Sequence, residues 1–245
     1  SILDRAVTET YAMKDLTPES NLRAFSRDQF PTMSDLYEVL RSMEGAEDLA
    51  TRLERYTTGI FSGFLNNLSN VNLSSQMVVF NLRDMEDELR PVAMYVVLHF
   101  IWNEIRSKLK KRLIVVDEAW VMMQYEDAGS FMFGIAKRCR KYFAGLTTIT
   151  QDIGDFLASK YGKPIVTNSS IQILLKQSPA AIDVIGDTFY LTDQERFMLL
   201  ESNVGEGIFF AGTKHVGIQV VASHSENQLV TSNPAELLER KEKEE

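Results

Sequence analysis

The chain has 245 residues, of which 44% are hydrophobic and 24% charged, and this length is enough to bury a full core in one domain or in one domain with a subdomain. Its formal net charge of −8 argues against a dedicated nucleic-acid binder, although a local basic groove could still exist in such a chain. The single cysteine, Cys139, excludes an internal disulfide and a cysteine-rich metal site, and the longest apolar run, 92–102, is too short to span a bilayer.

Residues 1–75 have the pattern of a mainly helical subdomain. Thr32 is a predicted N-cap, with Asp35 three residues later in the position that completes a capping box. A further helix is expected over 47–58, and the mixture of aromatic, Asn and Ser residues over 60–75 indicates a packed irregular loop.

After this subdomain the hydrophobic period changes. The run 77–82 predicts a buried strand, and Pro91 suits the first turn of a long helix that continues to about Lys111. The strand Leu113–Val116 follows, and a strand, a helix and a second strand form a βαβ unit with parallel strands. The residues of the long helix that are expected to face the core are Val96, Phe100, Ile101, Ile105 and Leu109.

The strand Leu113–Val116 is mostly β-branched and is therefore expected to be buried on both faces of a parallel sheet. Asp117 and Glu118 follow it directly, at the carboxyl end where open α/β sheets bind their ligands. One carboxylate can hold Mg²⁺ while its neighbour orients a water molecule for attack on a phosphate. The octet 113–120 has the form of a Walker B strand, and the alternative interpretation is the start of a solvated loop.

Next to this strand the sequence predicts a basic helix and a second strand. The helix is expected over 127–143, with cations including Arg138 and Arg140 projecting away from its apolar stripe. The strand over 146–150 ends in Gln151, which is either a site residue at the same sheet edge or a turn residue with local hydrogen bonds. The apolar stripe consists of Phe131, Ile135, Cys139 and Phe143.

In the remaining part of the chain, the sequence pattern predicts one further strand, a helix, a hairpin and a charged terminal helix. Thr192 and Glu195 form a predicted capping box at the start of the helix. The strand is expected over 171–175, the hairpin over 207–211 and 216–221, and the terminal helix over 232–245.

The order of these features resembles the RecA-like motors of the FtsK–HerA branch. More narrowly, it is similar to the type IV secretion and conjugation ATPases, the family of TraC and the fourth VirB component. The resemblance covers nearly the whole chain, and its specificity comes from the order and spacing of short motifs. These motifs are Pro31–Leu36, Asp117–Trp120, the basic cluster with Leu146–Gln151, Phe189–Thr192 with Glu195, and the closing hairpin.

The resemblance implies an α/β fold with a RecA-like, mainly parallel sheet flanked by helices and with an N-terminal helical subdomain. The implied domains are the subdomain at 1–75, the ATPase core at 76–231 and the charged helix at 232–245. Trp120 is expected to pack beside the end of the Leu113–Val116 strand.

The resemblance also implies the role of each site residue toward ATP. In that family the residue matching Asp117 helps to hold Mg²⁺, the one matching Glu118 activates water, and the one matching Gln151 lies close to the γ-phosphate. An arginine matching Arg140, or alternatively Arg138, reaches the nucleotide of the neighbouring subunit in a hexameric ring. The competing interpretation of this charge run is a solvated helix face.

One departure from the family pattern concerns phosphate binding. The chain nowhere contains G-x-x-x-x-G-K-[ST]. The nearest strings, Gly129–Gly134 followed by Ile135-Ala136, and Gly162-Lys163-Pro164, lack the required Lys-Ser/Thr ending or its glycines. This motif supplies the backbone N–H cradle and the lysine that hold the phosphates. The chain is therefore expected to be the part that follows the P-loop, and to be inactive as an ATPase by itself.

The function implied by the resemblance is that of a motor that couples ATP hydrolysis to pilus assembly or to export of protein or DNA. The expected partners are further copies of the chain and other secretion components, and the expected location is cytoplasmic, peripheral at the inner membrane through the secretion machine. One competitor is a DNA-pumping translocase, which would need a basic pore loop that the acidic balance does not favour. Another is a non-catalytic docking module of the same machine.

Overall fold

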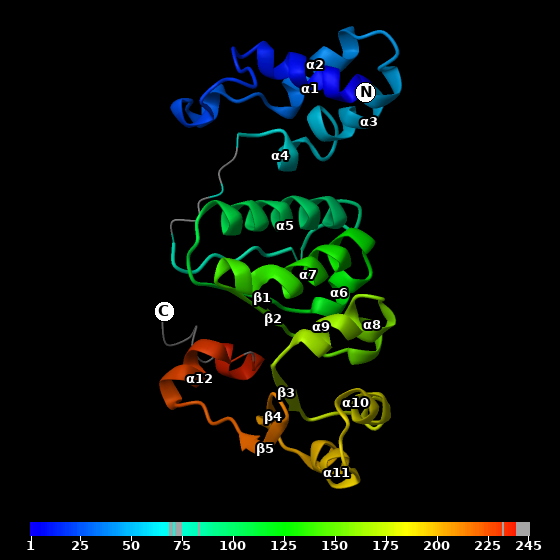
Figure 1. Cartoon of the computed structure of the whole chain (residues 1–245), viewed down its shortest axis with the longest axis vertical. Helices are drawn as coiled ribbons and strands as arrows, with labels where there is room; N and C mark the ends of the chain where they lie inside the picture. Colours follow the sequence, from blue (N-terminus) through cyan, green and yellow to red (C-terminus); the bar gives the residue numbers. More distant parts are fainter. Residues whose placement is uncertain (69–70, 72–74, 83, 232, 239–245) are drawn as a thin grey trace. The chain divides into compact units, whose positions relative to one another are not determined.

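The computed structural model describes residues 1–68, 71, 75–82, 84–231 and 233–238. The chain divides into two compact units, Ser1–Leu89 and Arg90–Glu245 (Figure 1). The candidate site residues all belong to the second unit. The predicted domain boundary between residues 75 and 76 does not coincide with the division between the compact units, and the domain assignment stays a prediction.

The first unit is helical in its described part. A small core holds it together, in which Ala6 of the first helix meets Val39 and Leu40 of the second. The capping box predicted for Thr32 is confirmed, because its backbone N–H and its hydroxyl both donate to Oδ2 of Asp35, at 2.6 Å and 2.9 Å. The elements are α1 (Ile2–Ala12), η1 (Leu22–Ala24), η2 (Arg27–Gln29), α2 (Met33–Ser42), α3 (Glu47–Thr57) and α4 (Ser62–Leu65).

The strand predicted over 77–82 is wrong, because these residues have no strand conformation and Met77 exposes 80% of its surface. Hydrophobic periodicity reports a tendency to be buried, whereas a strand also needs a neighbour that completes its hydrogen bonds. Within the described part of the chain, the only strand that pairs with β1 (Arg112–Val116) is β2 (Ala144–Thr148). Residues 77–82 therefore lie outside a sheet.

The βαβ unit predicted from the strands 77–82 and 113–116 does not form, because its first strand is absent. A parallel pair forms instead between β1 and β2, from Arg112 opposite Ala144 to Val116 opposite Thr148. This pairing confirms parallel strands in the second unit, with α6, α7 and η3 between them in the chain. The helices of this part are α5 (Arg90–Ser107), α6 (Ala119–Met123), α7 (Glu126–Arg138), η3 (Cys139–Tyr142), α8 (Ile153–Ala158) and α9 (Gly162–Asn168).

Helices α5 and α7 lie side by side over one face of the β1–β2 pair (Figure 1). Trp102 and Ile105 of α5 pack with Ile135 of α7 and Ala144 of β2 in a common core. The other face of β1 is open, with Leu113 exposing 70% and Val115 54% of their surfaces. The expectation of a strand buried on both faces is therefore wrong, because the described chain supplies a helical layer on one face only.

The inward face predicted for α5 is correct at Ile105 and wrong at Val96 and Leu109, which are both exposed. Leu109 lies beyond the last turn of the helix, which ends at Ser107. Because this helix is apolar around much of its circumference, periodicity alone does not determine its buried face. Its buried side chains are Ala93, Met94, Leu98, Trp102 and Ile105.

The helix predicted over 127–143 ends earlier than expected. The α-helical part stops at Arg138, the 3₁₀ turn η3 follows, and Phe143 has a φ of 54° and exposes 60% of its surface. A left-handed residue ends a helix and redirects the chain. The Phe143 carbonyl then accepts from the Arg112 N–H at 3.1 Å, which starts the pairing with β1. Phe143 therefore does not belong to the buried stripe.

The rest of the second unit is built on an antiparallel sheet of β3 (Ile171–Leu175), β4 (Glu206–Ala211) and β5 (Lys214–Gln219). The pairing of β4 with β5 confirms the predicted hairpin, and Gly212 supplies the positive φ of its turn. Helices α10 (Ile182–Phe189) and α11 (Asp193–Glu201) cover one face, and α12 (His224–Val230) follows the sheet. Of the terminal helix predicted over 232–245, residues 234–238 are helical, and residues 232 and 239–245 lie outside the described residues.

The predicted capping box of α11 is confirmed and is extended by an ion pair. The Thr192 backbone N–H and hydroxyl both donate to Glu195 Oε2 at 2.8 Å, and His215 Nε2 lies 2.6 Å from Glu195 Oε1. The hydrogen bond from the Thr192 N–H, helped by its hydroxyl and by the charge of His215, holds the pKa of Glu195 below its ordinary value of 4.5. Glu195 thus ties the start of α11 to β5.

We expect Glu195→Gln to lower the free energy of unfolding near neutral pH by about 0.5–1 kcal/mol, because the amide can keep the capping box but removes the negative charge that favours the helix start and pairs with His215. Because the pKa is lower in the folded chain, ionised Glu195 stabilises the fold above pH 4.5, and this contribution is lost as the pH falls through the folded pKa. Denaturant unfolding of both proteins at several pH values should therefore show a difference that shrinks in acid. Glu226→Gln is the matched control, because Glu226 closes the same kind of box on α12, which buries no side chain. A difference for Glu195→Gln that stays constant with pH would contradict the assignment.

Candidate functional site

The carboxyl end of β1 turns sharply into α6. The hydrogen bonds of the β1–β2 pair continue past both strands, with the Ile149 N–H donating to the Val116 carbonyl and the Ala119 N–H to the Ile149 carbonyl, each at 2.9 Å. Glu118 lies inside this turn with a φ of 48°, a left-handed conformation that is uncommon for a side chain other than glycine. Because Ala119 is completely buried, the turn is anchored on both sides of Glu118.

This turn brings together three of the residues predicted to form the site. The Gln151 amide, just beyond β2, donates to Oε1 of Glu118. The Asp117 carboxylate accepts from the Glu118 backbone N–H through Oδ1 at 3.0 Å and is otherwise exposed. Asp117, Glu118 and Gln151 therefore converge at the carboxyl edge of a parallel strand pair, as the sequence predicted.

Trp120 has a second function that the sequence did not indicate. Its indole N–H donates to Oε2 of Glu118, while its ring packs partly against the core around Ala119. The two oxygens of Glu118 thus receive one hydrogen bond each, from Trp120 and from Gln151. From the sequence, a tryptophan two residues after a carboxylate is most simply interpreted as a packing residue. In the structure, the left-handed conformation of Glu118 brings the two side chains into contact.

The carboxylate of Asp117 fits the requirements of a magnesium ion that is shared with a nucleotide. Mg²⁺ commonly takes one or two protein carboxylates and completes its octahedral shell with water and phosphate oxygens. The exposed Asp117 can offer such a ligand, because only one of its oxygens is engaged. In the described part of the chain there is no group of three His, Cys, Asp or Glu side chains that could hold a metal without further ligands.

Arg138 and Arg140 lie at the opposite end of β2 from this site. Arg138 is held within its own unit, because its Nε donates to the Gly134 carbonyl at 3.0 Å and its Cζ lies 5.0 Å from the centroid of the Trp102 ring. Arg140 is exposed, and its side chain makes no ion pair within the described part of the chain. With five residues at about 3.3 Å each, β2 separates Arg140 from Gln151 by roughly 17 Å.

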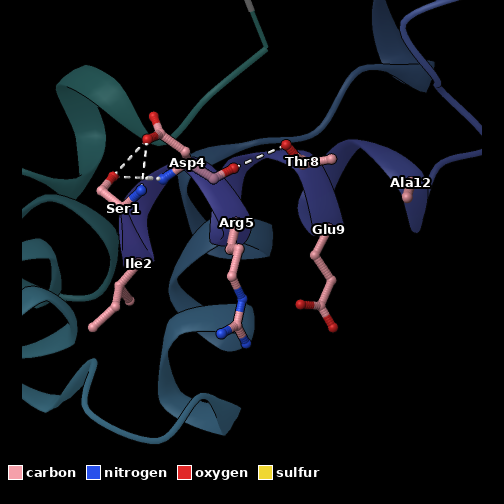
Figure 2. A pocket seen from close by; sticks show the side chains of 7 residues that line it. All are labelled: Ser1, Ile2, Asp4, Arg5, Thr8, Glu9 and Ala12. Atoms are coloured by element: carbon pink, nitrogen blue, oxygen red, sulfur yellow. Dashed lines mark hydrogen bonds and ion pairs between the residues drawn. The ribbon is translucent and has the colours of Figure 1, made fainter.

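Two other hollows on the described part of the surface contain none of these residues. A cleft of about 470 Å³ lies between α5 and the start of α7, with Tyr95, His99 and Phe131 among its aromatic walls. A shallow hollow runs along α1, and Figure 2 shows that its polar contacts are local ones, from Ser1 to Asp4 and from the Thr8 hydroxyl to the Asp4 carbonyl. Neither hollow brings together groups suited to phosphate chemistry.

The glycine-lysine pair at Gly162 has a packing role. A Cβ at Gly162 would lie 2.0 Å from the Phe156 carbonyl oxygen, so the start of α9 approaches the backbone of α8 closely at this point. The string Gly162-Lys163-Pro164 is therefore part of a helix contact within the described chain. The structure also contains, in its described residues, no helix with the length and apolarity needed to cross a membrane.

A parallel βαβ unit with an Asp-Glu pair after one strand and a glutamine after its neighbour is an arrangement found at the ligand-binding edge of α/β folds. This class is narrowed by comparison with known families. The model of the TraG P-loop domain matches residues 19–226, and the chain belongs to that family.

Two curated relatives and one solved structure show the same relationship. The type IV secretion system proteins virB4 of Bartonella quintana (strain Toulouse) and of Bartonella henselae (strain ATCC 49882 / DSM 28221 / CCUG 30454 / Houston 1) are each 28% identical over 165 residues, which is 64% of this chain and 20% of each relative. The structure of VirB4 of Thermoanaerobacter pseudethanolicus matches with a TM-score of 0.79 and 30% identity, over 92% of this chain and 64% of that one. The chain thus spans one fifth of the length of the Bartonella relatives.

Proposed function

We propose that this chain is the catalytic part of an ATPase that powers a type IV secretion system, in which it assembles with other secretion components at the cytoplasmic side of the inner membrane. The observation that carries this proposal is the convergence of Asp117, Glu118 and Gln151 at the carboxyl edge of β1 and β2. The similarity to three VirB4 proteins supports it.

The three residues divide the chemistry of ATP hydrolysis between them. Asp117 would hold Mg²⁺, which supplies charge neutralisation on the triphosphate. Glu118 orients a water molecule for attack on the γ-phosphate and withdraws its proton, because its carboxylate is fixed in direction by Trp120 and Gln151. Gln151, whose amide donates to Glu118, would lie beside the γ-phosphate and connect it to Glu118.

The phosphates themselves need a P-loop that lies outside these 245 residues. The chain belongs to a P-loop family, yet it contains no G-x-x-x-x-G-K-[ST], and its one glycine-lysine pair is engaged in packing. Because the chain covers only part of the VirB4 proteins it resembles, a further segment of a longer protein can supply the cradle. Asp117 and Glu118 would then face the nucleotide from the opposite side.

Arg140 acts in this proposal on the nucleotide of a neighbouring copy in a ring, which we take to be hexameric. Its distance from Gln151 along β2 prevents a direct role at the site of its own copy. Arg140 is preferred over Arg138 because Arg138 is already bound to Gly134 and stacked on Trp102. A guanidinium that is exposed in the single copy is available for bidentate contact with phosphate oxygens.

The experiment that tests the need for the P-loop compares the 245-residue chain with the longer natural protein in a steady-state phosphate-release assay. The chain by itself should show no appreciable ATP turnover, because it lacks the lysine and backbone cradle that bind the β- and γ-phosphates. The longer protein should turn over ATP and lose this activity in Asp117→Ala. Turnover by the 245-residue chain that disappears in Asp117→Ala would contradict the requirement for an external P-loop.

A further inference from the structure

The cleft between α5 and the start of α7 has the dimensions of a binding site. Its volume of about 470 Å³ lies within the usual range of ligand pockets. One wall runs from Pro91 to His99 on α5, and the other from Gln124 to Phe131. With 1.5 Å of rise per helical residue, the α5 wall is roughly 12 Å long, so the cleft is an elongated slot. None of the candidate catalytic residues lines it.

Four rings form an aromatic row that lines the cleft and continues beyond it. Tyr95, His99 and Trp102 follow one another along α5, and Phe131 of α7 joins the last two. The ring centroids of Tyr95 and His99 lie 4.2 Å apart, and those of His99 and Phe131 lie 5.6 Å apart. The Trp102 ring meets Phe131 edge-on at 6.4 Å. Because neighbouring rings touch, a ligand in the cleft can lie only against their free faces.

The Trp102 end of the aromatic row already holds two guanidinium groups of the chain itself. The Cζ atom of Arg138 lies 5.0 Å from the centroid of the Trp102 ring, and that of Arg106 lies 5.7 Å from it. Such contacts form because the face of an aromatic ring attracts a cation, and a planar guanidinium can stack on it. Within the described residues, no lysine or arginine lies over Tyr95 or Phe131. The cleft end of the row thus offers the same kind of surface without an occupant from the chain.

The charged groups at the cleft favour a cation. Its lining residues include two carboxylates, Glu126 and Asp127, and no lysine or arginine. Glu126 is paired with Lys160 and accepts from the Tyr161 hydroxyl at 2.7 Å, and these contacts hold its pKa below the ordinary value of 4.5. Its negative charge is therefore compensated by Lys160. Asp127 is exposed, and its carboxylate makes no hydrogen bond or ion pair among the described residues, so it is available to a ligand.

We infer that the cleft binds an arginine side chain carried by a segment of another protein. The guanidinium pairs with the Asp127 carboxylate and lies against the free faces of Tyr95 and Phe131. Arginine suits this site better than lysine, because its guanidinium is planar, more weakly hydrated and able to contact a carboxylate through two N–H groups. The slot is longer than a guanidinium, and the buried Met94 and Leu98 line it. Apolar side chains next to the arginine in the partner segment therefore fill the remaining length.

The first arm of the test compares two peptides that differ only in charge. The probes are acetyl-Leu-Arg-Leu-amide and the same peptide with citrulline, which keeps the shape of arginine and is neutral. Binding to the longer natural protein is followed by NMR through the methyl signal of Met94, which is assigned with Met94→Leu. The arginine peptide should shift this signal, and the citrulline peptide should bind roughly fivefold more weakly or worse. Equal affinity of the two peptides would overturn the inference.

The second arm changes the cleft in the same assay. Asp127→Asn should weaken binding of the arginine peptide by roughly two- to fivefold and leave the citrulline peptide nearly unaffected. Tyr95→Leu should weaken the arginine peptide as well, whereas Tyr95→Phe keeps the aromatic face and should restore it. The matched control is Asp155→Asn, which removes an exposed carboxylate from the first turn of another helix, α8, outside the cleft. Equal effects of Asp127→Asn and Asp155→Asn would contradict the assigned role of Asp127.

The third arm identifies the source of the arginine. Gln124, which is exposed on the rim of the cleft, is replaced by the photoreactive residue p-benzoylphenylalanine in the longer protein, and cross-linking is carried out in the cells that produce it. Mass spectrometry should show a linked peptide of another protein with an arginine close to the linked residue, and Asp127→Asn should reduce its yield. A linked peptide from this chain or from a second copy of it would overturn the inference. So would a linked peptide without arginine, or the absence of any cross-link.

The inference goes beyond the proposed ATPase function and is tested separately from it. Because Glu118 does not line the cleft, Glu118→Gln should leave the affinity for the arginine peptide unchanged, whatever its effect on ATP turnover. Loss of peptide binding in Glu118→Gln would show that the peptide binds at the candidate catalytic carboxylate and would overturn the assignment of the cleft.

Discussion

Glu118→Gln should lower the ATP turnover of the longer protein by about 10²–10⁴-fold and leave nucleotide affinity within a few-fold. The substitution is nearly isosteric, so it removes the carboxylate without opening a cavity. It also replaces an oxygen that accepts a hydrogen bond from Trp120 or Gln151 by an NH₂ group that cannot accept one. Phosphate release and the binding of a fluorescent nucleotide analogue measure the two quantities separately.

Trp120→Phe provides the matched control for this prediction. It keeps an aromatic ring beside the core around Ala119, and it removes the indole N–H that orients Glu118 together with part of the ring volume. The loss of turnover should therefore be smaller than in Glu118→Gln, because the carboxylate and its contact with Gln151 remain. Turnover of Glu118→Gln equal to that of the unchanged protein would show that another group activates the water.

The parts of the site that could be predicted are those set by local pattern and strand direction. A β-branched run followed by Asp117 and Glu118, with a second strand ending at Gln151, specifies a common edge once the strands are parallel. The same reasoning places Arg140 at the other end, because the helix that carries it must finish before β2 begins. Chain connectivity alone therefore fixes which residues can meet and which cannot.

The parts that could not be predicted depend on partners or on backbone conformations that periodicity does not report. Val115 belongs to a continuous apolar run, as a core residue would, yet its exposure depends on whether a second layer covers the strand. The left-handed residues Glu118 and Phe143 are equally invisible in a hydrophobic pattern. The first brings Trp120 onto the candidate catalytic carboxylate, and the second ends the basic helix and leaves an aromatic ring in solvent.

The Arg140→Ala variant of the longer protein should lose most of its ATP turnover and keep its nucleotide affinity within a few-fold. Arginines that act in trans contribute about 10³–10⁵-fold to the rate in other phosphoryl-transfer systems, because they neutralise charge that develops on the transferred group. Turnover of the unchanged protein should also rise more than linearly with protein concentration. Lys141→Ala is the matched control, since it removes the adjacent exposed cation of η3.

Mixing two inactive variants decides whether Arg140 acts on its own copy or on the next one. Arg140→Ala copies keep Glu118, and Glu118→Gln copies keep Arg140. In a mixed ring, some interfaces join an intact Glu118 to an intact Arg140 from the neighbour, and part of the turnover should return. Because roughly 17 Å of β2 separates Arg140 from Gln151 within one copy, recovery cannot come from contact inside a single chain. No recovery in rings whose mixed composition is verified would mean that Arg140 only supports the fold, and the same mixing with Arg138→Ala would then test the alternative arginine.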